Sequence, residues 1–324
     1  MESLISPPGA SPAPPTDARS TRMFAEAGEA PRVVERQLAD NVAPLGDLAR
    51  RVLALEPAMV FTCARGSSDH AATYAKYLFE THLGLPTLSH APSISSIYNK
   101  VLPAMRGQIF LAISQSGHSP DLIASAELAR KAGALVVALV NDIGSPLAHS
   151  ADFVLPMLAG SETSVAATKS YIATLSALAQ LANALRLDQA LESAIRALPE
   201  TLATAWSADW SAGEDLLAPV ANLYVLGRGL TLGAAQEASL KFKETAGIHA
   251  EAFSIAEVAH GPIALVGPEF PVLVMPPSEG ASAGLDDVLG RIAERSAPIL
   301  VVGSASRPAT TARTGDSGGT AGRA

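Results

Sequence analysis

The chain reads Ile-Phe-Leu-Ala-Ile-Ser-Gln-Ser-Gly-His-Ser from residue 109 to residue 119, followed by Pro120 and Asp121. The apolar run predicts a buried strand, and a proline followed by an acidic residue is typical of a first helical turn. Between strand and helix, hydroxyl and amide donors surround Gly117: Ser114, Gln115, Ser116 and Ser119. Because a helix N-terminus favours an anion, this turn predicts a phosphate site, which we call the phosphate cradle.

The cradle points to a small phosphorylated metabolite. No lysine of the kind that completes a triphosphate-binding loop follows Gly117. A nucleoside triphosphate is therefore the less favoured ligand. The alternative interpretation is an ordinary serine-rich turn between a strand and a helix.

Strands and helices alternate on either side of the cradle. The apolar runs predict strands at 58–63, 108–113, 135–140 and 152–156. Helical periodicity and Ala/Leu content predict helices at 69–82, 120–132 and 168–187. This alternation predicts an α/β fold with a parallel sheet covered on both faces, as in flavodoxin-like and Rossmann-like folds. Ligands of such sheets bind beyond the carboxyl ends of the strands, which is where the cradle falls.

The α/β unit recurs once. Ala64-Arg65-Gly66, with His70-Ala71-Ala72 after it, matches Gly227-Arg228-Gly229 and Gly233-Ala234-Ala235 without a gap. The next strand, helix and strand recur at 271–275, 285–293 and 298–302. The second copy has Pro276-Pro277-Ser278 where the first has its serines, so only the first copy is expected to carry a phosphate cradle.

We expect the following division of the chain. Its parts are a disordered leader at 1–22, an N-terminal helical segment at 23–57 interrupted by Pro44, a first domain at 58–190, a helical linker at 191–218, a second domain at 219–303 and a disordered tail at 304–324. After residue 302 only a polar tail follows, so the second copy is expected to be truncated relative to the first.

Composition excludes several classes of function. A hydrophobic content of 48% over 324 residues is enough to bury a large core. The net charge of −8 argues against a nucleic-acid partner. We expect no membrane partner, because the apolar runs are too short to cross a bilayer. One cysteine, Cys63, suits the reducing cytoplasm, and the histidines lack the spacing of metal ligands.

A second group of residues carries titratable side chains. On a helix, Glu237, Lys241 and Glu244 fall at i, i+4 and i+7 and share one face. A carboxylate paired with a lysine is suited to moving a proton between adjacent carbons of a sugar. His260 precedes a Gly-Pro turn and could open a sugar ring from a loop. The alternatives are a solvated salt-bridged helix face and a structural histidine.

Several segments in this order resemble one family. They are Ser114-Gln115-Ser116-Gly117, 164–169 (Ser-Val-Ala-Ala-Thr-Lys), 226–229 (Leu-Gly-Arg-Gly), 240–244 (Leu-Lys-Phe-Lys-Glu), 248–253 (Ile-His-Ala-Glu-Ala-Phe) and 260–265 (His-Gly-Pro-Ile-Ala-Leu). Over about residues 23–303 the chain resembles proteins with tandem sugar isomerase (SIS) domains, such as the isomerase half of glucosamine-6-phosphate synthase. The resemblance implies two tandem SIS domains.

The same resemblance implies roles for the candidate site residues. It implies that the substrate phosphate is bound by Ser114, Gln115, Ser116 and Ser119, and that the sugar is lined by Ser67, Ser68 and Val165. It implies that Glu244 shuttles a proton between C1 and C2, that Lys241 assists it and that His260 opens the ring. In that family the loop histidine enters the neighbouring subunit's site, so we expect a homodimer.

Two departures from the synthase pattern shape the expected function. The synthase begins with a cysteine-nucleophile glutaminase domain, whereas here Met1 is followed by Glu2 and Cys63 is the only cysteine. We therefore expect a cofactor-free glucosamine-6-phosphate deaminase that releases fructose 6-phosphate and ammonia. The alternatives are an isomerase or deglycase for another phosphosugar, such as galactosamine 6-phosphate or fructosamine 6-phosphate, and a non-catalytic sugar-phosphate sensor. Relatives also end in a segment whose lysine closes over the sugar, and no such ending is recognisable here.

Overall fold

Two parallel sheets form the framework of the chain in the computed structural model, which describes residues 17–277 and 281–303. The first sheet has the strand order β2-β1-β3-β4-β5. Its strands are β1 (Val60–Cys63), β2 (Thr87–Ser89), β3 (Ile109–Ser114), β4 (Leu135–Val140) and β5 (Phe153–Pro156). The second sheet has the order β7-β6-β8-β9. Its strands are β6 (Asn222–Gly227), β7 (His249–Ser254), β8 (Val272–Val274) and β9 (Ile299–Val301).

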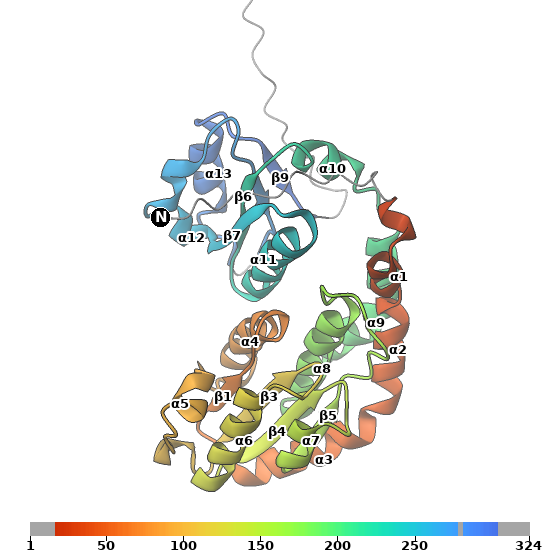
Figure 1. Cartoon of the computed structure of the whole chain (residues 1–324), viewed down its shortest axis with the longest axis vertical. Coiled ribbons are helices and arrows are strands. Elements are labelled where there is room, and N and C mark those ends of the chain that lie inside the picture. The colour runs from red at the N-terminus through yellow and green to blue at the C-terminus, as the bar shows by residue number, and fades with distance from the viewer. Residues whose placement is uncertain (1–16, 278–280, 304–324) are drawn as a thin grey trace, which may run out of the picture.

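Helices surround both sheets, and the predicted α/β class with parallel sheets flanked by helices is confirmed (Figure 1). The helices that precede or cover the first sheet are α1 (Arg22–Gly28), α2 (Ala30–Asp40), α3 (Val42–Leu55), α4 (Ser67–Leu78), α5 (Pro92–Ser96), α6 (Pro120–Ala132), α7 (Pro146–Ser150) and α8 (Lys169–Leu185). Those that follow are α9 (Gln189–Trp206), α10 (Ser211–Leu217), α11 (Leu230–Lys241), α12 (Ile255–Val258) and α13 (Leu285–Ala293). Within the described ranges, no helix combines the length and apolar character that crossing a membrane requires.

The alternation of side chains along β3 builds the core on both faces of the first sheet. All six residues of β3 and all six of β4 are buried. Leu111 belongs to the cluster formed with α3, α4 and α8, whereas Phe110 belongs to the cluster formed with α6 and α7. A strand buried on both faces reads as a continuous apolar run, and such a run precedes the phosphate cradle.

The two domains meet through α4 and α11, which lie side by side between the sheets (Figure 1). Both helices begin at a glycine with a positive φ: 54° at Gly66 and 62° at Gly229. A Cβ at Gly233 would lie 2.6 Å from the carbonyl oxygen of His70, so a glycine is needed for this close approach. The contact brings side chains of both domains to one place.

The N-terminal region differs from the prediction in two respects. Helical structure begins at Ala18 rather than after residue 22, because the side chains of Asp17 and Thr21 cap the first turns. The long helix breaks at Asn41 rather than at Pro44, which lies in the first turn of α3, where a missing N–H is tolerated. The rest of the predicted leader and the predicted tail lie outside the described residues.

The second sheet has four strands in the part of the chain that the structure describes, and none of them corresponds to β5. Its edge strand β7 was not among the predicted strands. The alternating polar residues of β7, His249 and Glu251, are exposed, as is typical of an edge strand with one solvated face. Ser278, on which part of the comparison between the copies rests, lies outside the described residues.

Candidate active site

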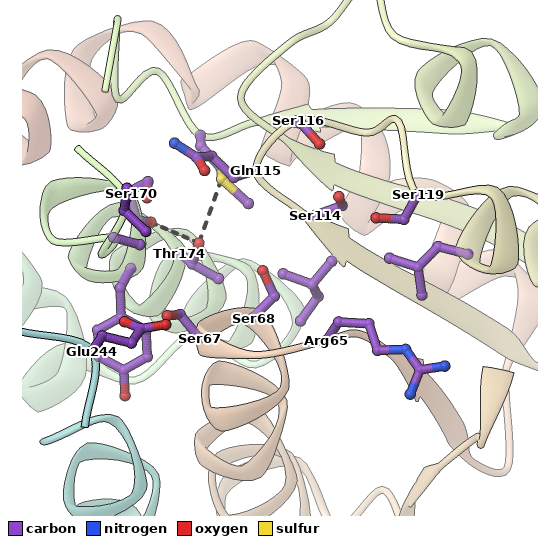
Figure 2. A pocket seen from close by; sticks show the side chains of 16 residues that line it. Arg65, Ser67, Ser68, Ser114, Gln115, Ser116, Ser119, Ser170, Thr174 and Glu244 are labelled. Carbon is purple, nitrogen blue, oxygen red and sulfur yellow. Dashed lines mark hydrogen bonds between the residues drawn. The ribbon is translucent and has the colours of Figure 1, made fainter. Parts of the chain in front are cut away.

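A cavity of about 230 Å³ opens at the carboxyl end of the first sheet, where the second domain closes one side of it. Figure 2 shows the cradle serines on one side, Glu244 on the other, and Ser67 and Ser68 between them. Eight of the ten residues that are predicted to bind or convert the ligand line the cavity: Ser67, Ser68, Ser114, Gln115, Ser116, Ser119, Val165 and Glu244. Ser170 and Thr174 of α8 line it as well, whereas Lys241 and His260 are not part of its described lining. Residues from strand ends, helix N-termini and a second domain thus surround one space.

The cradle depends on Gly117. Its φ of 65° lies in the left-handed region, and an added Cβ would lie 2.1 Å from Oγ of Ser145. The Gly117 amide donates to Oγ of Ser114 at 3.1 Å, and the Gly117 carbonyl accepts from the Leu147 amide at 3.1 Å. Because Ser114 accepts this hydrogen bond, its own hydroxyl proton is available to a ligand.

Ser119 is the residue that precedes the first turn of α6. Its side chain makes no capping hydrogen bond with the helix. The hydroxyl lines the cavity instead, together with that of Ser116. A ligand anion at this place would receive hydroxyl donors at the positive end of the helix dipole.

An ion pair covers the one acidic side chain in the first turn of α6. Nε and Nη2 of Arg65 donate to Oδ2 of Asp121 at 2.9 and 2.7 Å. This fork balances the charge of Asp121, so an anion in the cradle does not face an unpaired carboxylate. Arg65 itself lines the cavity.

On the other side of the cavity, Lys241 ends α11 and lies between a carboxylate of that helix and one of the π-helical turn Phe242–Ala246 that follows it. Nζ of Lys241 lies 2.7 Å from Oε2 of Glu244 and 3.1 Å from Oε1 of Glu237. The predicted shared face of these three residues is therefore present. Nζ also donates to Oγ of Ser67 in the first domain at 3.3 Å. Lys241 thus links the carboxylate that lines the cavity to residues of both domains.

His70 completes this network, and the sequence analysis does not identify it. Nδ1 of His70 lies 2.8 Å from Oε2 of Glu237, whose side chain is 7% exposed. Burial acts to raise the pKa of Glu237, but the hydrogen bond from His70 and the charge of Lys241 outweigh it and hold the pKa below its ordinary value. The two residues are 167 positions apart, so no local pattern connects them.

Tyr171 is a further cavity residue that the sequence analysis does not single out. It projects from α8 and lines the cavity. Its hydroxyl is buried and has no hydrogen-bond partner among the described residues. Burial, followed by the negative charge of Glu237, raises the pKa of Tyr171, so the group stays neutral and can donate a hydrogen bond.

His260 is the one predicted catalytic residue that the single chain does not bring to this place. It is exposed in the turn between α12 and the short helix Pro262–Leu265. The described lining of the cavity contains Glu244 but not His260. That His260 acts in the site of a neighbouring subunit stays a prediction.

Comparison with known proteins identifies the family. A family model described as "SIS domain" matches residues 56–184 and 216–311. A glutamine–fructose-6-phosphate aminotransferase (isomerizing) of Sulfurisphaera tokodaii is 34% identical over 257 residues, which cover 78% of this chain and 42% of that protein. The chain spans less than half the length of the curated relatives it matches.

Solved structures agree with the family match. A protein assigned as a phosphosugar isomerase from Silicibacter pomeroyi DSS-3 is 40% identical, with a TM-score of 0.84 over 88% of this chain and 87% of that chain. The C-terminal domain of glucosamine-fructose-6-phosphate aminotransferase from Francisella tularensis is 26% identical, with a TM-score of 0.74 over 88% of this chain and 85% of that one.

Proposed function

Because the chain belongs to the SIS domain family, we propose that it binds a phosphosugar in the cavity of Figure 2 and moves a proton between C1 and C2 of the sugar. One observation carries the proposal. A single cavity holds the hydroxyl cradle of the first domain and the carboxylate of Glu244 from the second, with Lys241 2.7 Å from that carboxylate. The cradle would hold the phosphate while Glu244 acts on the far end of the sugar.

The base and its neighbour have distinct roles in this proposal. Glu244 takes the proton from C2 of the open-chain sugar and returns it to C1. Lys241 places a positive charge beside Glu244 and holds its carboxylate through a short contact. Ser67 and Ser68 face the middle of the cavity, where they would donate to sugar hydroxyls.

The specific reaction that we propose is deamination of glucosamine 6-phosphate. In the open-chain form, C1 is an aldehyde and C2 carries the amine. Loss of the C2 proton gives an enaminol, and protonation at C1 then gives a ketimine at C2. Water adds to the ketimine and ammonia leaves, so glucosamine 6-phosphate and water become fructose 6-phosphate and ammonia.

One observation supports an amino sugar and the release of ammonia. Curated relatives of this chain carry names that join an aminotransferase to an isomerase of fructose 6-phosphate.

We further propose that the active unit is a homodimer in which His260 opens the sugar ring in the partner's cavity. The exposure of His260 in this chain supports the proposal. An imidazole can exchange protons with the ring oxygen and the anomeric hydroxyl near neutral pH.

We propose the cytoplasm as the place where the protein acts, because the reduced, buried thiol of Cys63 suits a reducing compartment.

The test is to incubate the purified protein with glucosamine 6-phosphate and to measure ammonia and fructose 6-phosphate. Parallel reactions contain galactosamine 6-phosphate or fructosamine 6-phosphate, and fructose 6-phosphate in D₂O reports isomerisation through deuterium at C1. Glu244→Gln should remove product formation and deuterium exchange while glucosamine 6-phosphate still binds. Glu294→Gln, at an exposed position after α13, is the matched control.

The outcomes separate the candidate functions. Exchange in D₂O without ammonia from any amino sugar would identify an isomerase rather than a deaminase. Tight binding of phosphosugars by a folded protein with neither exchange nor ammonia would favour the sensor. Full activity of Glu244→Gln would show that another group is the base.

A further inference from the structure

The segment between β5 and α8, residues 157–168, forms one wall of the cavity without being a helix or strand. It contributes Met157, Val165 and Ala167 to the lining. The side chain of Val165 is 99% exposed, so its own packing does not determine where it lies. A segment of this kind keeps its position only if other groups satisfy its backbone.

Glu26, in α1 and 137 positions before Thr163, accepts hydrogen bonds from the middle of this segment. Oε1 of Glu26 accepts from the amide of Thr163 at 2.7 Å and from its hydroxyl at 3.2 Å. Oε2 accepts from the amide of Ser164 at 3.2 Å. Nη1 of Arg22 donates to Oγ1 of Thr163 at 2.8 Å, so two side chains of α1 converge on the same turn.

Both ends of the segment are held by α2 and the two residues that flank it, Glu29 and Asn41. Nε2 of Gln37 donates to the carbonyl of Met157 at 2.8 Å, and Nδ2 of Asn41 donates to that of Pro156 at 2.9 Å. Nζ of Lys169 lies 2.6 Å from Oε2 of Glu29. With the ends fixed in this way, Glu26 accepts from the backbone amides of both residues that precede Val165, and Arg22 adds a contact to the hydroxyl of Thr163.

A carboxylate is the group that this position requires. Glu26 is 6% exposed, and burial acts to raise its pKa, but the hydrogen bonds from Ser164 and Thr163 outweigh it and hold the pKa below its ordinary value. The ionised carboxylate can accept from two amides at once. Residues 163 and 164 immediately precede Val165, so the position of the carboxylate is transmitted directly to the cavity wall.

We infer that Glu26 is a positioning residue for the sugar-facing wall of the cavity, so that the N-terminal helices belong to the binding site although they do not line it. The inference rests on the proposed function for the identity of the ligand, a phosphosugar. Glu26 contacts none of the cradle residues in the described structure. The cradle contacts the segment through Gln115, whose Nε2 donates to Oε2 of Glu162 at 3.1 Å.

The test compares Glu26→Gln and Glu26→Asp with Glu35→Gln, which changes an exposed residue of α2. Hydrogen exchange of the full chain reports residues 158–168, and calorimetry measures binding of glucosamine 6-phosphate and of inorganic phosphate. Because each Glu26 variant weakens a charge-assisted hydrogen bond, we expect exchange at 163 and 164 to accelerate and phosphosugar affinity to fall roughly tenfold. Inorganic phosphate should bind as to the wild type, and Glu35→Gln should change neither.

If the wild-type protein converts glucosamine 6-phosphate, the KM of each Glu26 variant for this sugar should rise as its affinity falls. The kcat of each variant should change less than its KM. Faster exchange with unchanged phosphosugar affinity would overturn the inference, and so would an equal loss of inorganic phosphate binding with a lowered Tm. A wild-type protein that binds phosphosugars without turnover would contradict the proposed reaction, but the affinity comparison would still decide the role of Glu26.

Discussion

Nδ1 of His70 lies 2.8 Å from Oε2 of Glu237 and joins α4 of the first domain to α11 of the second. The contact is possible because Gly233 lets the two helices approach closely. Glu237 in turn contacts Lys241, and Lys241 contacts Glu244, which lines the cavity. A side chain of the first domain therefore supports the proposed base of the second.

The first prediction concerns His70→Ala. Removal of the imidazole leaves a buried carboxylate with one fewer hydrogen bond, so the free energy of unfolding should fall by about 1–3 kcal/mol. The pKa of Glu237 should rise, since the hydrogen bond from His70 lowers it now. Urea unfolding monitored by circular dichroism measures the loss, and kcat for glucosamine 6-phosphate should fall with it.

His249→Ala is the matched control for this variant, because His249 is exposed on β7. It should leave both stability and kcat near the wild-type values. Equal stability of His70→Ala and the wild type would mean that the contact between His70 and Glu237 contributes nothing to the fold.

Lys241→Met tests the ammonium that lies between two carboxylates. Without its charge, Glu237 and Glu244 lose the cation that they share, and the proposed base loses the contact that holds it, so kcat for glucosamine 6-phosphate should fall roughly tenfold in steady-state kinetics. The neighbouring Lys243→Met removes an exposed lysine that does not line the cavity in the described structure. An identical kcat for the two variants would contradict the role given to Lys241.

The sequence predicts the interior strands of the first sheet well because they are buried on both faces and have continuous apolar sequences. The short edge strand β2, with two of its three residues exposed, is not predicted. Leu135–Val140 and Pro120–Ala132 are found at the predicted residues. The edge strand β7 is not predicted, because its alternating titratable residues suggest chemistry rather than a solvated strand face. The interior strands are predictable because they are buried, not because of the strand propensity of their residues.

The candidate site is predictable only where it is local. The cradle lies within one strand-to-helix turn, and Lys241 and Glu244 share one turn of one chain segment. The contacts of Glu26 with Thr163 and of His70 with Glu237 join residues 137 and 167 positions apart. No periodicity or motif encodes such pairs in a single sequence, because they follow from how the helices pack.

Ser116→Ala tests the phosphate cradle. The variant removes a hydroxyl that lines the cavity and would contact phosphate in both the ground state and the transition state, so KM should rise roughly tenfold with kcat retained. Steady-state kinetics with glucosamine 6-phosphate measure the change, and the affinity for inorganic phosphate should fall by the same factor. Ser193→Ala, on the exposed face of α9, should change neither. A fall in kcat at constant KM would argue against a phosphate contact.

Gly117→Ala separates backbone strain from steric overlap. At φ 65° an alanine is strained by about 1–2 kcal/mol, and its Cβ would also lie 2.1 Å from Oγ of Ser145. Gly247→Ala has nearly the same φ, 66°, but its Cβ meets nothing within 4 Å. Gly117→Ala should therefore lower the Tm more than Gly247→Ala and abolish phosphate binding. Equal Tm values would mean that the loop carrying Ser145 moves aside without loss.

The last prediction is the pH dependence of stability through Glu237. Its pKa is below the ordinary value of 4.5 in the folded protein, so the carboxylate stabilises the fold at pH values above 4.5. That contribution is lost as the pH falls through the folded-state pKa, because the unfolded chain binds the proton first. Urea unfolding between pH 7 and pH 3 should show the wild type losing its advantage over Glu237→Gln below pH 4.5, whereas a constant difference between the two proteins would place the titration elsewhere.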